Sequence, residues 1–192
     1  MRSSLGKNLL LTGPPGCGKT TVVRRVVETL GDLHLAGFDT RELREGGQRV
    51  GFEIVGLGGR RSILAHIGWS SGPRVGRYFV EPANLEEILK AELERPANGV
   101  NAYVIDEIGR MECYCPRFVT TVRHVLGGPV PVLASLSRKG TGLIAEVKSR
   151  PDVEIVVVTT GNRDKLPTDL AQFFRQVEPQ SKLNWRSLDQ FI

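Results

Sequence analysis

The sequence predicts a single α/β domain of three layers, in which helices cover both faces of a mostly parallel sheet with an inserted antiparallel hairpin. Three observations lead to this fold class. Strand-like and helix-like segments alternate along the chain, the predicted strands are almost wholly apolar, and two segments are separated by a Gly-Gly turn signal. The first two features are typical of parallel strands buried between helices. The third indicates the hairpin.

Length and composition agree with one soluble domain, which we expect to span residues 1–178, followed by a polar tail at 179–192. The chain has 192 residues, of which 40% are hydrophobic and 24% charged, and a formal net charge of +5. This balance excludes a disordered protein. No apolar run approaches the ~20 residues of a membrane span, and no long basic run indicates nucleic-acid binding. An odd number of cysteines, without a secretory segment, favours a reducing cytoplasmic setting.

The N-terminal half contains a short buried strand, an amphipathic helix and then a predominantly antiparallel region. The helix has apolar residues at helical spacing and ends at Gly31, where a C-cap glycine belongs. Gly58-Gly59 lies between two strand-like runs and predicts the hairpin turn. In chain order we expect a strand at 9–11, a helix at 22–30, a strand at 33–38, hairpin strands at 48–57 and 60–67, and an antiparallel extension at 74–81.

The C-terminal half returns to alternating helices and strands. Asn84 followed by Glu87 three residues later predicts a capping box at the start of a helix that Pro96 ends. Pro116 suits the first turn of another helix. The predicted elements are a helix at 84–96, a strand at 102–107, a helix at 116–126, a strand at 129–137, a helix at 143–150, a strand at 153–160 and a helix near 167–177.

A glycine-rich loop with one lysine separates the first strand from the first helix. The stretch "GPPGCGKT" fits the phosphate-binding pattern G-x-x-x-x-G-K-[ST] (Walker A). Glycine permits the backbone N–H groups to close around phosphate, Lys19 would meet the β- and γ-phosphates, and the Thr20 hydroxyl would coordinate Mg²⁺. The predicted nucleotide-binding residues of this segment are Gly13, Pro14, Pro15, Gly16, Cys17, Gly18, Lys19, Thr20 and Thr21.

A pair of carboxylates ends the apolar strand "YVIDEIG" and supplies the second half of such a site (Walker B). Asp106 has the position of a residue that holds Mg²⁺ with Thr20, so these two are the predicted metal ligands. Glu107 can polarise a water or a hydroxyl for attack on the γ-phosphorus, so Glu107 and Lys19 are the predicted catalytic residues. The predicted nucleotide-binding residues here are Val104, Ile105, Asp106, Glu107, Ile108 and Gly109.

Several motifs, taken together and in order, resemble one family. They are "LLTGPPGCGKTT", "GFDTRELR" (37–44), "RVGFEIV" (49–55), "RVGRYFV" (74–80), "VIDEIGRME" (104–112) and "VTTGNRDKL" (158–166). Over about residues 8–170 the chain is similar to the small nucleoside-triphosphatases that include a human cancer-related member and thermophile relatives. The resemblance implies a RecA-like P-loop fold and slow, Mg²⁺-dependent hydrolysis of nucleoside 5′-triphosphates (ATP, GTP, CTP, UTP), with broad tolerance of the base. Cys113, Cys115 and the loop "SLSRKG" (135–140) depart from the family pattern.

Other polar residues have a functional and a structural interpretation. Asn162 and Arg163 follow a strand where many P-loop proteins hold the base, but they also suit a helix cap. Cys17 is a candidate redox residue or simply a small side chain in the loop, and "CYC" at 113–115 lacks the partners of a four-ligand zinc site. Arginines within the family motifs are candidates for stabilising the transition state: Arg41, Arg44, Arg74 and Arg77.

Three functions remain open from the sequence. The first is a nucleoside-triphosphatase, and the second is a nucleoside or nucleotide kinase whose acceptor pocket lies in the hairpin region. The third is a nucleotide-dependent switch, because "DEIG" also satisfies D-x-x-G, although "NRDK" at 162–165 does not match the guanine signature. The sequence leaves the oligomeric state open.

Overall fold

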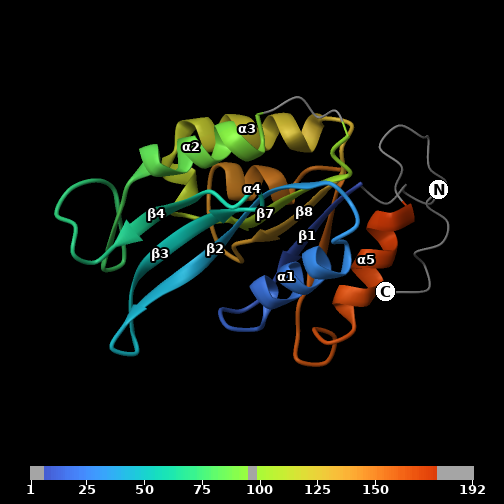
Figure 1. Cartoon of the computed structure of the whole chain (residues 1–192), viewed down its shortest axis with the longest axis horizontal. Helices are drawn as coiled ribbons and strands as arrows, with labels where there is room; N and C mark the ends of the chain where they lie inside the picture. Colours follow the sequence, from blue (N-terminus) through green and yellow to red (C-terminus); the bar gives the residue numbers. More distant parts are fainter. Residues whose placement is uncertain (1–6, 95–98, 177–192) are drawn as a thin grey trace.

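The computed structural model describes residues 7–94 and 99–176, which form a nine-stranded sheet with helices on both faces (Figure 1). The strand order is β5-β6-β4-β3-β2-β7-β8-β1-β9. The strands are β1 (Asn8–Thr12), β2 (Leu35–Glu45), β3 (Gln48–Gly56), β4 (Arg61–His66), β5 (Arg74–Val75), β6 (Tyr78–Val80), β7 (Ala102–Ile108), β8 (Val132–Leu136) and β9 (Val153–Val157). The predicted tail at 179–192 lies outside the described residues, and the domain limits stay a prediction.

Helices connect the parallel strands and fix the three layers. They are α1 (Lys19–Thr29), α2 (Pro82–Glu92), a single 3₁₀ turn η1 (Glu112–Tyr114), α3 (Pro116–Gly127), α4 (Leu143–Lys148) and α5 (Leu166–Gln176). Figure 1 shows α1 and α5 on one face of the sheet and α2, α3 and α4 on the other. No helix among the described residues is long and apolar enough to cross a membrane. A cytoplasmic location stays a prediction.

The parallel half of the sheet consists of β2, β7, β8, β1 and β9, which pair in register along their apolar residues. Alternate residues of these strands face opposite layers. Leu9 and Leu11 pack with α1 and α5, whereas Leu10 belongs to the cluster beneath α2, α3 and α4. Burial of both strand faces therefore explains why these strands are apolar without alternation. The predicted mostly parallel α/β sheet is confirmed for this half.

The antiparallel part is larger than the predicted hairpin, and this prediction is corrected. The Gly58-Gly59 turn is present, since β3 pairs antiparallel with β4. However, β2 does not end at residue 38: it continues to Glu45 and turns at Gly46-Gly47 into β3. Both glycines have positive φ, at 53° and 79°, as a two-residue hairpin turn requires. Strands β3, β4, β6 and β5 thus extend the sheet beyond β2.

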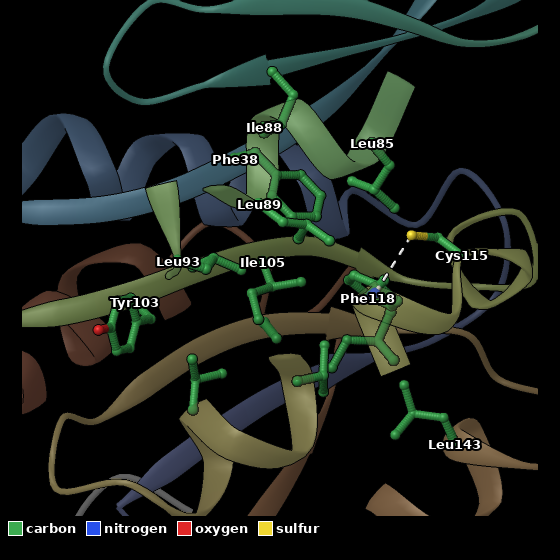
Figure 2. Packing of buried hydrophobic residues seen from close by; sticks show 14 of the residues in the cluster. Phe38, Leu85, Ile88, Leu89, Leu93, Tyr103, Ile105, Cys115, Phe118 and Leu143 are labelled. Carbon is green, nitrogen blue, oxygen red and sulfur yellow. Dashed lines mark hydrogen bonds between the residues drawn. The ribbon is translucent and has the colours of Figure 1, made fainter. Parts of the chain in front are cut away.

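The larger core cluster lies between the sheet and α2, α3 and α4. Figure 2 shows Phe38 of β2 and Phe118 of α3 meeting below α2; their ring centroids are 6.3 Å apart. Cys115 is fully buried there, and its sulfur accepts a hydrogen bond from the Phe118 N–H at 3.4 Å, so it caps α3 ahead of Pro116. Cys115 is therefore a structural residue, and the predicted start of this helix at Pro116 is confirmed.

The predicted capping box of α2 is wrong. The helix begins at Pro82, and the side chain of Glu81 caps it by accepting from the Ala83 N–H at 3.3 Å. Proline is favoured in the first turn because its missing N–H would lack a partner there in any case. Asn84 instead lies inside the first turn and donates its amide to the Ile63 carbonyl at 2.8 Å, which ties α2 to β4.

Candidate active site

The loop at residues 13–18 joins β1 to α1 and has the backbone of a phosphate cradle. Gly13, Gly16 and Gly18 all have positive φ. A Cβ atom on Gly13 would lie 2.7 Å from the Cys17 sulfur and 2.8 Å from the Val158 carbonyl oxygen, so no larger residue fits there. Gly18 precedes α1 in a left-handed conformation without a side-chain cap. The first N–H groups of α1 therefore remain available to an anion.

Two cavities meet at this loop. The carboxylate cavity, of about 610 Å³, contains Asp106, Glu107 and Glu112, and the arginine cavity, of about 570 Å³, contains Arg24 and Arg41. Both are lined by Gly16, Lys19, Thr20, Thr40 and Glu42. Lys19 and Thr20, the first residues of α1, thus lie where the two cavities meet, and they can bind a phosphate chain that enters from either cavity.

Asp106 lies at the end of β7, is 1% exposed, and accepts a hydrogen bond on Oδ1 from the Ser135 hydroxyl of β8. Its Oδ2 is buried without a hydrogen-bond partner. Burial raises the pKa of Asp106 to about 6; Ser135 and the nearby Thr20 hydroxyl oppose the rise, while the charges of Glu107 and Asp39 add to it. A buried carboxylate oxygen beside the Thr20 hydroxyl is the kind of donor that takes a hard cation.

Glu107 follows Asp106 but is only half-buried and lines the carboxylate cavity. Its Oε1 accepts a hydrogen bond from the Ser137 hydroxyl. The pairing of β7 with β8 shifts register between Ile105 and Ile108, and such an irregularity re-aims side chains that a regular strand would place on opposite faces. Both carboxylates are consequently held by serines two residues apart. Ser135 and Ser137 were not predicted as site residues; the feature of the sequence that indicates them is a pair of small polar residues at the end of an apolar strand.

Glu112 is a further carboxylic acid of the carboxylate cavity that the sequence analysis did not assign to the site. It is 5% exposed. A Cβ on Gly109 would lie 2.7 Å from Glu112 Oε2 and 3.1 Å from Glu107 Oε1, so Gly109 lets the two carboxyl groups approach each other. Burial raises the pKa of Glu112 to about 8, and the neighbouring charges of Glu107 and Asp106 add to this rise. At neutral pH Glu112 therefore carries a proton and can donate a hydrogen bond.

Glu112→Gln is expected to remove a pH dependence of stability. The folded state holds the Glu112 proton up to about pH 8, whereas the unfolded chain releases it near its ordinary value of 4.5. Because the folded state binds more protons in between, the free energy of unfolding falls as pH rises, by up to about 1.4 kcal/mol per unit. Urea unfolding in EDTA between pH 6.5 and 8 measures this slope. The slope should flatten in Glu112→Gln but not in the exposed control Glu146→Gln; an equal slope in both contradicts the assignment.

Asp39 and Thr40 of β2 also belong to this region, and neither was predicted. Asp39 is opposite Asp106 in the β2–β7 register, is 4% exposed, and accepts hydrogen bonds from Arg24 at 2.5 Å and Arg41 at 3.2 Å. The hydroxyl oxygen of Thr40 is buried without a partner although Thr40 lines both cavities. The feature of the sequence that could have indicated Asp39 and Thr40 is the polar stretch that follows the apolar start of this strand.

The remaining predicted nucleotide-binding residues have diverse surroundings. Pro14 supplies a carbonyl that accepts from the Cys17 N–H at 3.2 Å, and Cys17 packs against the core beneath α1 and α5. Pro15 and Gly109 line the carboxylate cavity, and Thr21 lines the arginine cavity. The side chains of β7 that are buried in the core and support Asp106 from behind are Val104, Ile105 and Ile108.

Asn162 and Arg163 lie in the turn before α5, outside both cavities. The Asn162 side chain accepts from the Thr159 N–H at 2.8 Å and donates to the Val157 carbonyl at 2.9 Å, so it ties the turn to the end of β9, and these two bonds are not those of a helix cap. The aliphatic stem of Arg163 lies near Gly18. A contact of either residue with a base stays a prediction.

Among the four arginines considered for the transition state, Arg41 lines the arginine cavity, where Asp39 holds it. The others lie outside both cavities: Arg44 pairs with Glu42, Arg74 donates to the Gly76 carbonyl, and Arg77 donates to Tyr78. The cations that line the carboxylate cavity with Glu107 are Lys19 of the glycine loop and, further, Arg110, Arg138 and Lys139.

The cysteines do not form a metal site in the part of the chain that the structure describes. No group of three or more His, Cys, Asp or Glu side chains there is arranged to hold a metal ion. Burial raises the pKa of Cys113 to about 11 and also raises that of Cys115, which disfavours the reactive thiolate form at both positions.

Comparison with known proteins connects this geometry to an activity. A protein-family model described as NTPase matches residues 8–171. The chain is 42% identical to the nucleoside-triphosphatase THEP1 of Thermofilum pendens, covering 86% of this chain and 94% of that protein, and 34% identical to the human cancer-related nucleoside-triphosphatase, covering 86% and 95%. The crystal structure of THEP1 from Aquifex aeolicus superimposes with a TM-score of 0.77 at 33% identity, covering 85% of this chain and 96% of that one.

Proposed function

The chain belongs to the nucleoside-triphosphatase family and is an enzyme of that class, and we propose that it hydrolyses ATP, GTP, CTP and UTP slowly to diphosphate and phosphate with Mg²⁺. The proposed substrate and mechanism rest on one observation. Lys19 and Thr20 of the glycine loop line the same cavity as Asp106 and Glu107 near the end of β7. A triphosphate whose γ-phosphate reaches this cavity meets a cation, a metal-binding pair and a base.

The positions of the side chains support direct attack by water on the γ-phosphorus. The glycine loop and the start of α1 hold the phosphates through backbone N–H groups, and Lys19 neutralises the charge on the β- and γ-oxygens. The Ser137 hydroxyl fixes Glu107 through Oε1. The other carboxylate oxygen orients a water for in-line attack and accepts its proton. The oxygen–phosphorus bond to water forms as the bond to the β-phosphate oxygen breaks, and the diphosphate leaves.

The residues fit a magnesium ion. Mg²⁺ is bound in such sites through one or two protein oxygens together with substrate phosphates and waters. Asp106 offers a buried Oδ2 without a partner, and Thr20 offers its hydroxyl beside it. Asp106 and Thr20 would hold the ion, which when bound neutralises charge on the phosphate oxygens.

Removal of the metal is expected to abolish phosphate release. The variant Asp106→Asn should raise the Mg²⁺ concentration needed for the half-maximal rate by about tenfold or more, because the amide lacks the charge of the carboxylate. A Mg²⁺ titration of phosphate release measures this. The control Asp32→Asn changes an exposed carboxylate that pairs with Arg175 and should leave the titration unaltered. Full activity in excess EDTA would contradict the metal assignment.

Broad base tolerance is supported by what surrounds the nucleoside side of the loop. The arginine cavity there is lined by threonines, glycines and arginines together with Lys19 and Glu42, and Glu42 is paired with Arg44 and Arg49. Asn162 has both ends of its amide engaged with backbone. The carboxylate and the amide described in these two places are therefore already bonded within the protein, which favours tolerance of the base. Phosphate release from ATP, GTP, CTP and UTP tests the proposed function directly: we expect kcat/KM values within about tenfold of one another, and a chain that releases phosphate from none of them contradicts the proposal.

A kinase activity is a second candidate that one observation favours. The cavity that Glu107 lines is also lined by Phe52 and Val75 of the antiparallel extension, and Glu107 can take a proton from a hydroxyl as well as from water. An assay with γ-labelled ATP and candidate acceptors separates the two activities, because transfer leaves the label on the acceptor.

A further inference from the structure

The two cavities at the glycine loop lie at opposite ends of a bound triphosphate, if the proposed nucleotide binding is correct. In such loops the backbone cradles the α- and β-phosphates, and the lysine reaches the β- and γ-phosphates. Thr21 and Arg24 lie further along α1 and line the arginine cavity, whereas Asp106 and Glu107 line the carboxylate cavity. The nucleoside therefore leaves through the arginine cavity, and the γ-phosphate points into the carboxylate cavity.

The carboxylate cavity is much larger than hydrolysis requires. An attacking water occupies about 30 Å³, whereas the cavity of about 610 Å³ includes the space at the glycine loop and extends to Phe52, Val75 and Met111, which lie outside the loop. Cavities that bind small molecules have volumes of roughly 300–1,000 Å³. The cavity also opens at the C-terminal ends of β1, β7 and β8, where open α/β sheets bind their ligands. Room remains there for a second molecule beside the γ-phosphate.

One wall of this remaining space is apolar and comes from the antiparallel extension. Phe52 of β3 and Val75 of β5 line it, and Met111, which follows β7, lines the same cavity. Phe52 is held in place, because its ring meets Tyr78 edge-on at 5.1 Å and the Arg49 guanidinium lies 5.2 Å from its centroid. An aromatic side chain that is held in place and lines a cavity is suited to contact a planar ring.

Other residues that line the cavity carry positive charge and have no ion-pair partner among the described residues. Arg110 follows β7, and Arg138 and Lys139 follow β8; all three are exposed and line the cavity. Within the part of the chain that the structure describes, none of the three forms an ion pair. Glu42 does not neutralise them, because it is engaged by Arg44 and Arg49. Guanidinium and ammonium groups around a cleft favour phosphate.

We propose that the carboxylate cavity contains a second small-molecule site, bounded by Phe52, Val75 and Met111 and by Arg110, Arg138 and Lys139, which binds a phosphorylated compound with a planar ring while a triphosphate occupies the glycine loop. The Thr40 hydroxyl, buried without a partner at the junction of the cavities, is placed to bond either ligand. This site deepens the proposed function, because its ligand lies beside the γ-phosphate.

The test uses a probe that combines a ring with a phosphate. The full chain is saturated with Mg²⁺ and a fluorescent ATP analogue whose β–γ bridge is an imide, and AMP, GMP, CMP and UMP are then titrated by calorimetry. We expect at least one monophosphate to bind with a stoichiometry of one per chain while the fluorescence of the bound analogue shows that it stays in place. No binding by any of the four, or displacement of the analogue, would overturn the proposal.

A pair of variants at one position separates the site from a nonspecific charge effect. Val75→Glu places a negative charge in the cavity and should weaken monophosphate binding at least tenfold, whereas Val75→Lys, of similar size, should not weaken it. Thermal unfolding checks that both variants fold equally well. Equal affinities in the two variants would contradict the site. Failure of the analogue to bind at all contradicts the proposed function as well, whereas phosphate release without second-site binding contradicts the second site alone.

Discussion

Glu107→Gln should retain binding of Mg²⁺-nucleotide and lose hydrolysis by about 10²- to 10⁴-fold, the usual contribution of a positioned general base. The amide has the size of the carboxylate and can still accept the hydrogen bond from Ser137, but it cannot take a proton from the attacking water. Lys19, Thr20 and the loop backbone remain unaltered. Binding of a nonhydrolysable analogue and single-turnover phosphate release measure the two effects separately.

The matched control for this variant is Glu146→Gln, which removes an exposed carboxylate paired with Arg123 on the surface. It should leave both binding and turnover as in the unmodified chain. Undiminished hydrolysis by the Glu107→Gln variant would contradict the assignment of Glu107 as the general base. A parallel loss of nucleotide binding would instead assign Glu107 to substrate or metal binding.

Lys19→Ala is expected to weaken triphosphate binding by about 10- to 100-fold, the effect of losing one charge-assisted hydrogen bond, and to lower hydrolysis by a further 10²- to 10³-fold. Lys19 lines both cavities and, among the described residues, has no ion-pair partner, so its charge is available to the β- and γ-phosphates. Direct titration with a fluorescent analogue and phosphate release measure the two losses.

Lys90→Ala serves as the control, because Lys90 is an exposed lysine whose partner is Glu87 on the same helix. Surface pairs of this kind contribute little to stability, so this variant should behave as the unmodified chain. Tight triphosphate binding by Lys19→Ala would contradict the phosphate-site assignment. Loss of folding is detected by thermal unfolding without ligand, where the two variants should match.

The sequence predicted the parts of this site that depend on local pattern. A glycine loop between an apolar strand and an amphipathic helix commonly binds phosphate. Two carboxylates at the end of an apolar strand can be recognised from the sequence without a structure. Asp106 and the loop were therefore found, and the structure places both at one cavity. Their functional roles remain predictions until the variants above are measured.

The residues that were missed depend on pairing between distant segments. Ser135 and Ser137 hold the two carboxylates only because β8 lies beside β7, and Asp39 is opposite Asp106 only because β2 lies on the other side. The long β2–β3 hairpin was missed because Gly46-Gly47 lies in a polar stretch that has no apolar alternation to mark a strand. From the sequence, Glu112 was only a letter of a family motif and was not assigned to the site. It is buried because the η1 turn brings its carboxyl group close to Gly109.

Hydrolysis of ATP in H₂¹⁸O under single-turnover conditions tests the central claim most directly, namely that water oriented by Glu107 attacks the γ-phosphorus of a triphosphate held in the glycine loop. The account predicts one ¹⁸O atom in the released phosphate, none in the ADP, and a rate that falls at least about 100-fold in Glu107→Gln. Label in the diphosphate, or the same rate in both proteins, would contradict it.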